Sequence, residues 1–184
     1  MLSLVTPPTA EPVSLAAAKA HLRVEHALED DGISAWLAAA RQHAEAVTGR
    51  QLPPATWALT LDAFPDAGCA ILVPRPPLKS VTSIAYIDTA GATQTWPVAA
   101  YDVEIPVGPL ALHGRIRPAF GEVYPATRAV SEAVTITFIA GYDSVPYPLH
   151  AALLLGVGEL YVRREQPDLD RAMTRLLDPF KVWH

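Results

Sequence analysis

The sequence predicts an α+β protein that is mainly α-helical, with two N-terminal and two C-terminal helices and an inserted antiparallel β region. Apolar residues recur with the helical period of 3.6 near both ends of the chain and alternate with a period of two in the middle. Proline and glycine turn signals separate the two patterns. The expected organisation is one domain, 1–184, made of N-terminal helices (11–52), a β insertion (56–140), C-terminal helices (148–178) and a tail (179–184).

Two helices are expected before the β region, at residues 15–23 and 30–48. Acidic residues suit the positive end of the second helix, and Gly49 suits its C-terminal stop. The apolar positions of this helix follow the helical period. Arg41 and Glu45 fall outside the apolar stripe, so we expect them to lie as a pair on the outer face of the helix.

Short β-strands are expected in the middle of the chain. DTAGA at 88–92 is a turn signal, and it predicts a hairpin with Gly91 at positive φ. PRPP at 74–77 could be a proline-rich ligand or a junction between two strands. The flanking apolar runs favour the junction, because proline cannot donate to a sheet ladder. The expected strands are 56–61, 70–73, 80–87, 93–96, 101–103, 110–112 and 134–139.

Two further helices are predicted near the C-terminus. The first, from 149 to about 165, is apolar on almost every side and must therefore be buried. Gly156 and Gly158 each cost about 1 kcal/mol relative to alanine, which favours a place where another backbone comes close. The second, 169–177, is amphipathic and ends before Pro179.

Charge and composition exclude several classes of function. The 184 residues carry a net charge of -5, so the chain lacks the basic footprint that holds nucleic acid by its phosphates. The single cysteine, Cys69, excludes an internal disulfide, and we expect it to be buried in its apolar run. We see no signal peptide and no run long enough to span a bilayer, so we expect a soluble chain made in the cytoplasm.

Sequence motifs typical of enzymes are absent. The densest group of possible ligands surrounds the junction of the first two helices, and it could be a metal site or the catalytic site of a small cytoplasmic enzyme. A solvated helix junction explains it more simply, so we expect no catalytic residue, no metal and no cofactor. The group consists of His21, Glu25, His26, Glu29, Asp30 and Asp31.

A second polar group, LHGRIRP, carries His113, Arg115 and Arg117. These side chains could contact phosphate or the carboxylates of a partner. Arginines on an exposed edge more often serve solubility, and we favour that explanation.

Five stretches, in this order along the chain, are specific when taken together. They are EPVSLAAAKAHLRV (11–24), ISAWLAAARQHAEAVTGRQL (33–52), PRPPLKSVTSIAYIDTAGA (74–92), FIAGY (138–142) and LLLGVGELYVRRE (153–165). With the order of elements, they resemble the head-to-tail connector (adaptor) family of tailed bacteriophages and gene transfer agents. One departure is Ala17, where the family pattern leads us to expect an acidic residue after the first helix cap.

The resemblance implies a structural, non-enzymatic role in the neck of a virion or virus-like particle. About twelve copies of a connector form a ring beneath the portal protein and extend its channel. Double-stranded DNA passes through without sequence-specific binding, and the ring docks a head-closure (stopper) or tail component. No membrane is involved. The alternatives are the small enzyme and a proline-peptide interaction module built on PRPP.

The resemblance also suggests two sets of site residues. Connectors of this family use terminal segments to bind the portal, which would give the aromatic tail a role; docking of the tail on its own domain is the alternative. The portal-binding candidates are Leu176, Leu177, Phe180 and Trp183. The ring-packing candidates are Trp36, Leu37, Leu154 and Tyr161.

Overall fold

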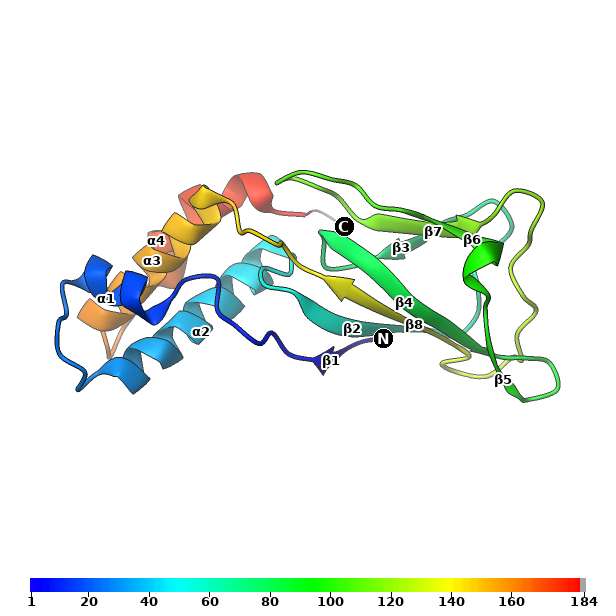
Figure 1. Cartoon of the computed structure of the whole chain (residues 1–184), viewed down its shortest axis with the longest axis horizontal. Coiled ribbons are helices and arrows are strands. Elements are labelled where there is room, and N and C mark those ends of the chain that lie inside the picture. Colours follow the sequence, from blue (N-terminus) through cyan, green and yellow to red (C-terminus); the bar gives the residue numbers. More distant parts are fainter. Residues whose placement is uncertain (183–184) are drawn as a thin grey trace. The chain divides into compact units, whose positions relative to one another are not determined.

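The computed structural model describes residues 1–182 and divides the chain into two compact units (Figure 1). The β unit comprises Met1–Pro8 and Pro54–Gly141, and the helical unit comprises Thr9–Pro53 and the chain from Tyr142 onward. The α+β class is confirmed. The expectation of a mainly helical chain is not confirmed, because helix accounts for 32% of the residues and strand for 25%.

Within residues 1–182, the helical unit contains four α-helices and a short 3-10 helix. α2 has the expected bounds, and Gly49 ends it in the left-handed region with φ of +70°. None of the helices within residues 1–182 is both long and apolar enough to cross a membrane. The elements are α1 (Leu15–Leu22), α2 (Asp30–Thr48), α3 (Tyr147–Val162), α4 (Leu169–Leu177) and the 3-10 helix η2 (Asp178–Phe180).

α3 contacts each of the other three α-helices and, like α2, contributes a large share of the apolar side chains of their common core. Gly156 permits this close packing. A Cβ at position 156 would lie 2.6 Å from the Sδ of Met173 on α4 and 3.1 Å from the Cβ of Ala40 on α2. A close neighbour is therefore present at Gly156, but it consists of side-chain atoms of Met173 and Ala40 and not of another backbone.

The β unit consists of two antiparallel sheets that share one core. The larger sheet has the strand order β1-β2-β8-β4-β5, and the smaller has the order β3-β7-β6. Val134, Ile136 and Phe138 of β8 are fully buried, as their alternation with threonine predicts. The strands are β1 (Leu2–Thr6), β2 (Ala55–Leu61), β3 (Ile71–Val73), β4 (Leu78–Ile87), β5 (Thr93–Thr95), β6 (Tyr101–Glu104), β7 (Gly114–Pro118) and β8 (Val134–Ala140), with a 3-10 helix η1 (Val98–Ala100) before β6.

Two of these strands, β1 and β7, differ from the sequence-based expectation. β1 pairs with β2 at the edge of the large sheet, and β7 pairs with both β3 and β6. The expected strand at 110–112 does not form. In β7 only Ile116 is apolar and buried, and an arginine stands on each side of it, so pairing with two neighbours decides the conformation more than local alternation does.

The PRPP segment joins β3 to β4, so the prediction of a strand junction is confirmed. Pro76 is buried, and Arg75 has a left-handed backbone with φ of +60°. The Arg75 guanidinium lies over the ring of Trp57, 5.1 Å from its centre. A buried proline does not fit an extended ligand that waits for a partner.

We expect Gly114→Ala to destabilise the β unit by about 2 kcal/mol, a typical cost of overpacking a core. A Cβ at position 114 would lie 2.2 Å from the Cδ2 of Leu78, which is itself buried. Urea denaturation measures the loss. Gly32→Ala is the control, because the nearest atom to its Cβ, on Trp36, is 4.0 Å away. Equal midpoints for the wild type and Gly114→Ala would contradict the prediction.

Candidate functional site

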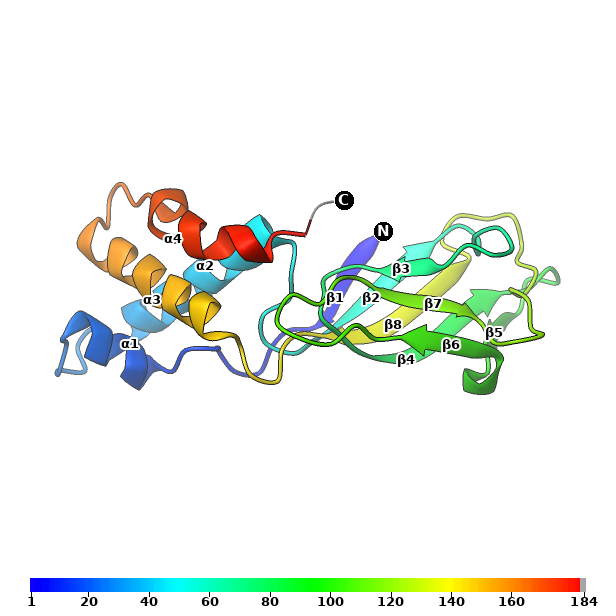
Figure 2. The same ribbon diagram turned by 90° about the horizontal axis from the view of Figure 1, so that it is seen from above.

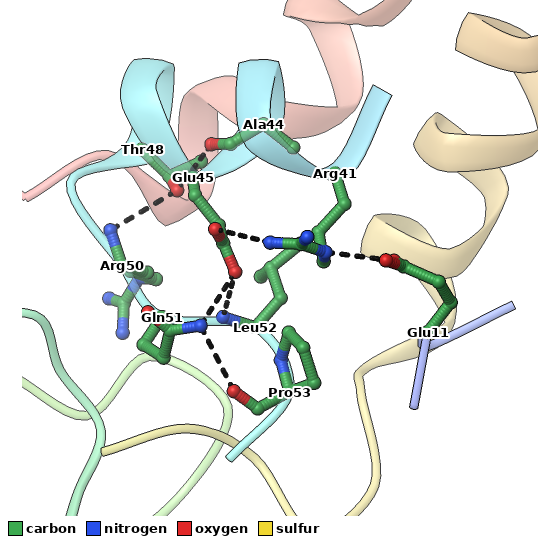
Figure 3. Close-up of polar contacts among 9 residues, drawn as sticks. All are labelled: Glu11, Arg41, Ala44, Glu45, Thr48, Arg50, Gln51, Leu52 and Pro53. Atoms are coloured by element: carbon green, nitrogen blue, oxygen red, sulfur yellow. Dashed lines mark hydrogen bonds and ion pairs between the residues drawn. The ribbon is translucent and has the colours of Figure 1, made fainter. Parts of the chain in front are cut away.

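A buried polar network lies at the C-terminal end of α2 (Figure 3). Arg41 and Glu45 are only 9% and 8% exposed, so their expected solvent-facing position is wrong. Arg41 donates from Nε to Glu11 (2.8 Å) and from Nη1 to Glu45 (2.9 Å). The other carboxylate oxygen of Glu45 accepts from the Gln51 amide (2.8 Å) and the Leu52 N–H (3.1 Å). We call these five residues the Glu45 network.

A second set of contacts, the Arg50 bridge, ties the end of α2 to the chain that follows α4. Arg50 is 1% exposed and donates from Nε to the carbonyl of Phe180 at 2.6 Å. Its Nη1 donates to the hydroxyl of Tyr142 at 3.2 Å. Burial raises the pKa of Tyr142, and the Arg50 guanidinium opposes part of that rise. The N–H of Val182 donates to the carbonyl of Thr48 at 2.9 Å, so the C-terminal segment is held at two points.

Three of the four portal-binding candidates lie beside the Arg50 bridge. Leu177 and Phe180 are buried in the helical core, and Leu176 packs partly buried against it. Trp183 lies outside the described residues. The described side chains therefore contact their own unit, and their role toward a portal stays a prediction.

The four ring-packing candidates belong to the helical core or its margin. Leu37 is buried in that core, whereas Trp36, Leu154 and Tyr161 are partly exposed against it. The rings of Trp36 and Tyr161 meet edge to face with their centres 5.8 Å apart. The Arg164 guanidinium lies 5.3 Å from the first ring centre and 5.2 Å from the second. No contact described here bears on packing between copies.

The acidic and histidine group at the α1–α2 junction is engaged in ion pairs. Asp30 binds Lys19 at 2.6 Å. Glu29 accepts from the Tyr161 hydroxyl at 3.0 Å and from Arg164 at 2.5 Å. Within residues 1–182, no three His, Cys, Asp or Glu side chains come together in a way that could hold a metal ion. The exposed members of the group are His21, Glu25, His26 and Asp31.

We expect the pKa of Glu29 to depend on Arg164. The hydrogen bond from Arg164, and after it the one from Tyr161, lower this pKa below its ordinary value of 4.5. Because folding lowers the pKa, the contact stabilises the protein above that ordinary value and is lost as the pH falls through the folded pKa. Arg164→Met should raise the pKa of Glu29 toward 4.5, as measured by its carboxyl ¹³C shift against pH. Arg163→Met should leave it unchanged, and equal shifts in both variants would contradict the assignment.

The arginines of β7 face acidic residues of the neighbouring strand. The register places Arg117 opposite Asp102 and Arg115 opposite Glu104, where the charged atoms are 3.9 Å apart. His113 precedes the strand and is half-buried. The positive charges of Arg115 and Arg117 are therefore balanced by acidic residues of β6, and this surface of the small sheet is not a basic patch.

Cys69 is exposed, so the expectation of a buried thiol is wrong. The residue lies in the loop before β3, and only Ile71 and Val73 of the apolar run point into the core. The Cys69 carbonyl accepts a hydrogen bond from the Tyr124 hydroxyl at 2.8 Å.

A four-helix unit combined with a two-sheet β unit defines the fold class of this chain. No family model and no curated protein sequence matches it. Solved structures of gene transfer agent (GTA) particles contain chains with the same fold. A chain in "Neck of empty GTA particle computed with C6 symmetry" has a TM-score of 0.82 and 22% sequence identity. Chains in "Virion of native gene transfer agent (GTA) particle" and "Neck of native GTA particle computed with C12 symmetry" both have a TM-score of 0.80, with sequence identities of 24% and 22%, respectively. Each match covers 100% of this chain and 96% of the other.

Proposed function

We propose that this chain is a structural neck component of a tailed phage or a phage-like particle such as a gene transfer agent. About twelve copies form a ring under the portal protein, extend the DNA channel and dock a head-closure or tail component. The role is non-enzymatic. The observation that carries the proposal is the likeness to neck and virion chains over the full length of this one, at TM-scores of 0.80 to 0.82.

Two of the similar neck structures were computed with C6 and C12 symmetry, which supports a ring as the form of assembly. A closed ring of identical copies uses one repeated contact between two different surfaces of the chain. Trp36, Leu154 and Tyr161 are partly exposed and remain our candidates for such contacts. Leu37 is buried and would support them from the core.

The charge distribution supports a channel that releases DNA. Each phosphate neutralised by a cation strengthens salt-dependent binding, and one such cation per copy becomes about a dozen in the proposed ring. This chain carries a net charge of -5, and its two β7 arginines stand opposite acids. Both features would weaken the hold of such a ring on DNA.

The C-terminal segment is our candidate for the portal contact. Trp183 and the half-buried Leu176 would contact the portal directly, since buried aromatic anchors often dominate interfaces. Leu177 and Phe180, which are buried in the helical core, would hold the segment in position.

Electron microscopy of the chain co-expressed with the portal protein of its particle tests the proposal. We expect a ring of about twelve copies on the portal, and the absence of any complex would contradict the neck role. A truncation after Val182 keeps every contact described for the Arg50 bridge, so its thermal midpoint should stay unchanged while portal binding weakens at least tenfold. Unchanged portal binding would contradict the anchor alone.

A further inference from the structure

One apolar stripe of α3 is left uncovered by the other helices. Tyr147, Ala151, Leu155, Gly158 and Val162 follow one another at intervals of three or four residues, so they lie on a single face of the helix. Tyr147 is 90% exposed, Val162 78% and Leu155 44%. We call these five residues the α3 stripe. It contains no charged side chain and runs the full length of the helix.

The C-terminal half of the stripe is the floor of a groove. α3 runs between α1 and α4 (Figure 2), and residues of all three helices line a pocket of about 570 Å³. His21 and Leu22 of α1 and Ala172 of α4 contribute to its walls. The groove is therefore a recess within the helical unit whose floor is apolar, and its lining also includes Glu159 and Arg163, which pair with each other at 3.4 Å.

Gly158 has no packing role inside the chain. A Cβ at position 158 would meet only the Nε2 of His21, at an ordinary contact distance of 3.6 Å. Gly156, two residues earlier, is different because a Cβ there would collide with Met173. A glycine disfavours a helix relative to alanine, and an alanine would fit at position 158, so packing among the described residues does not require glycine there. The missing side chain leaves the backbone of α3 accessible from the groove.

The size of the stripe indicates the kind of partner. α3 has 16 residues, which gives a length of about 24 Å; with a width of about 10 Å the stripe covers roughly 240 Å². A stable complex of two proteins needs about 800 Å² on each partner. A contact of this size does not hold two isolated copies together. In a closed ring each copy has two neighbours, so the loss of one copy breaks two such contacts, and the repeated contact can stabilise the ring.

We propose that the α3 stripe is a contact surface between copies, which receives an uncharged apolar element of the next copy of this chain at Gly158. The inference rests on the proposed ring and deepens it by naming the surface. Because the stripe is recessed, the surface that fills it lies elsewhere on the neighbouring copy, as a ring requires.

Gly158→Leu separates the proposed contact from folding. The new side chain has room in the groove of its own chain and favours the helix, so the thermal midpoint should stay equal or rise. The same side chain would occupy the space of the neighbour, and the number of copies per portal should fall from about twelve to fewer than three by mass photometry. A full ring formed by Gly158→Leu would overturn the inference.

A photo-crosslinking amino acid at position 162 identifies the occupant in assembled necks. We expect covalent pairs of this chain, and the matched control at Val98, an equally apolar side chain that is 72% exposed, should give none. Crosslinks from 162 only to the portal or to another component, or no crosslinks in assembled necks, would overturn the inference while the proposed function stands. If the chain is absent from purified particles, the proposed function fails as well.

Discussion

Arg50→Ala is expected to lower the free energy of unfolding by about 4 kcal/mol, which combines the loss of a large buried side chain with the loss of charge-assisted hydrogen bonds. Arg50 is 1% exposed, and its removal leaves the Phe180 carbonyl and the Tyr142 hydroxyl without this donor. Urea denaturation measures the loss. The Val182 amide should also exchange faster with solvent, because its acceptor on Thr48 lies next to the missing bridge.

Two further variants isolate the cause. Arg171→Ala removes an exposed guanidinium and should change the free energy of unfolding by less than about 0.5 kcal/mol. Arg50→Met keeps much of the buried volume without the hydrogen bonds, and it should recover only part of the lost stability. A methionine variant as stable as the wild type would mean that desolvation of the guanidinium cancels its hydrogen bonds, and our account of the bridge would then be wrong.

Glu45→Ala is the second large effect, and we expect a loss of about 3 kcal/mol. The carboxylate accepts from Arg41, from the Gln51 amide and from the Leu52 N–H. The loss should fall at the lower end of the range for broken buried ion pairs, because Arg41 keeps its contact with Glu11. Chemical denaturation gives the free energy, and faster exchange of the Leu52 amide would locate the change.

Glu165→Ala is the matched control for Glu45, because Glu165 is exposed and its loss should be within about 0.5 kcal/mol of zero. In the double variant Arg41→Met/Glu45→Met both charges disappear together. Its destabilisation should be smaller than the sum of the Arg41→Met and Glu45→Met single variants by at least about 1 kcal/mol. Strictly additive effects would show that the two side chains do not act as a pair.

Local signals in the sequence were sufficient to predict the long elements. α2 follows from a sustained apolar period and Gly49, and β8 follows from the strict alternation of its apolar residues with threonine. β1 and β7 could not be predicted in the same way. Each has five residues, and their place depends on neighbours that are distant in the sequence, such as β2 for β1.

The polar networks are harder to predict, because burial depends on tertiary contacts. Arg41 and Glu45 have the spacing of an ordinary surface pair, and only the contacts with Glu11 and Gln51 reveal that they are buried. One signal was available: Thr48, Arg50 and Gln51 place polar side chains between Val47 and Leu52, at the C-terminal end of α2. Sequence periodicity describes one helix at a time and does not include such partners.

The two units are interleaved along the chain, which has a consequence for folding during synthesis. The helices of Thr9–Pro53 are made first, but α3 and α4 follow only after the 88 residues Pro54–Gly141. At about 5–20 residues per second, synthesis of Pro54–Gly141 alone takes roughly 4–18 s, and the N-terminal helices wait at least this long for the rest of their core, while the β unit can already be complete. Their apolar faces are exposed to the ribosome and to chaperones during that interval. Arg50 is made 130 residues before its acceptor, the Phe180 carbonyl, so the bridge forms only after α4 and η2 have left the ribosome.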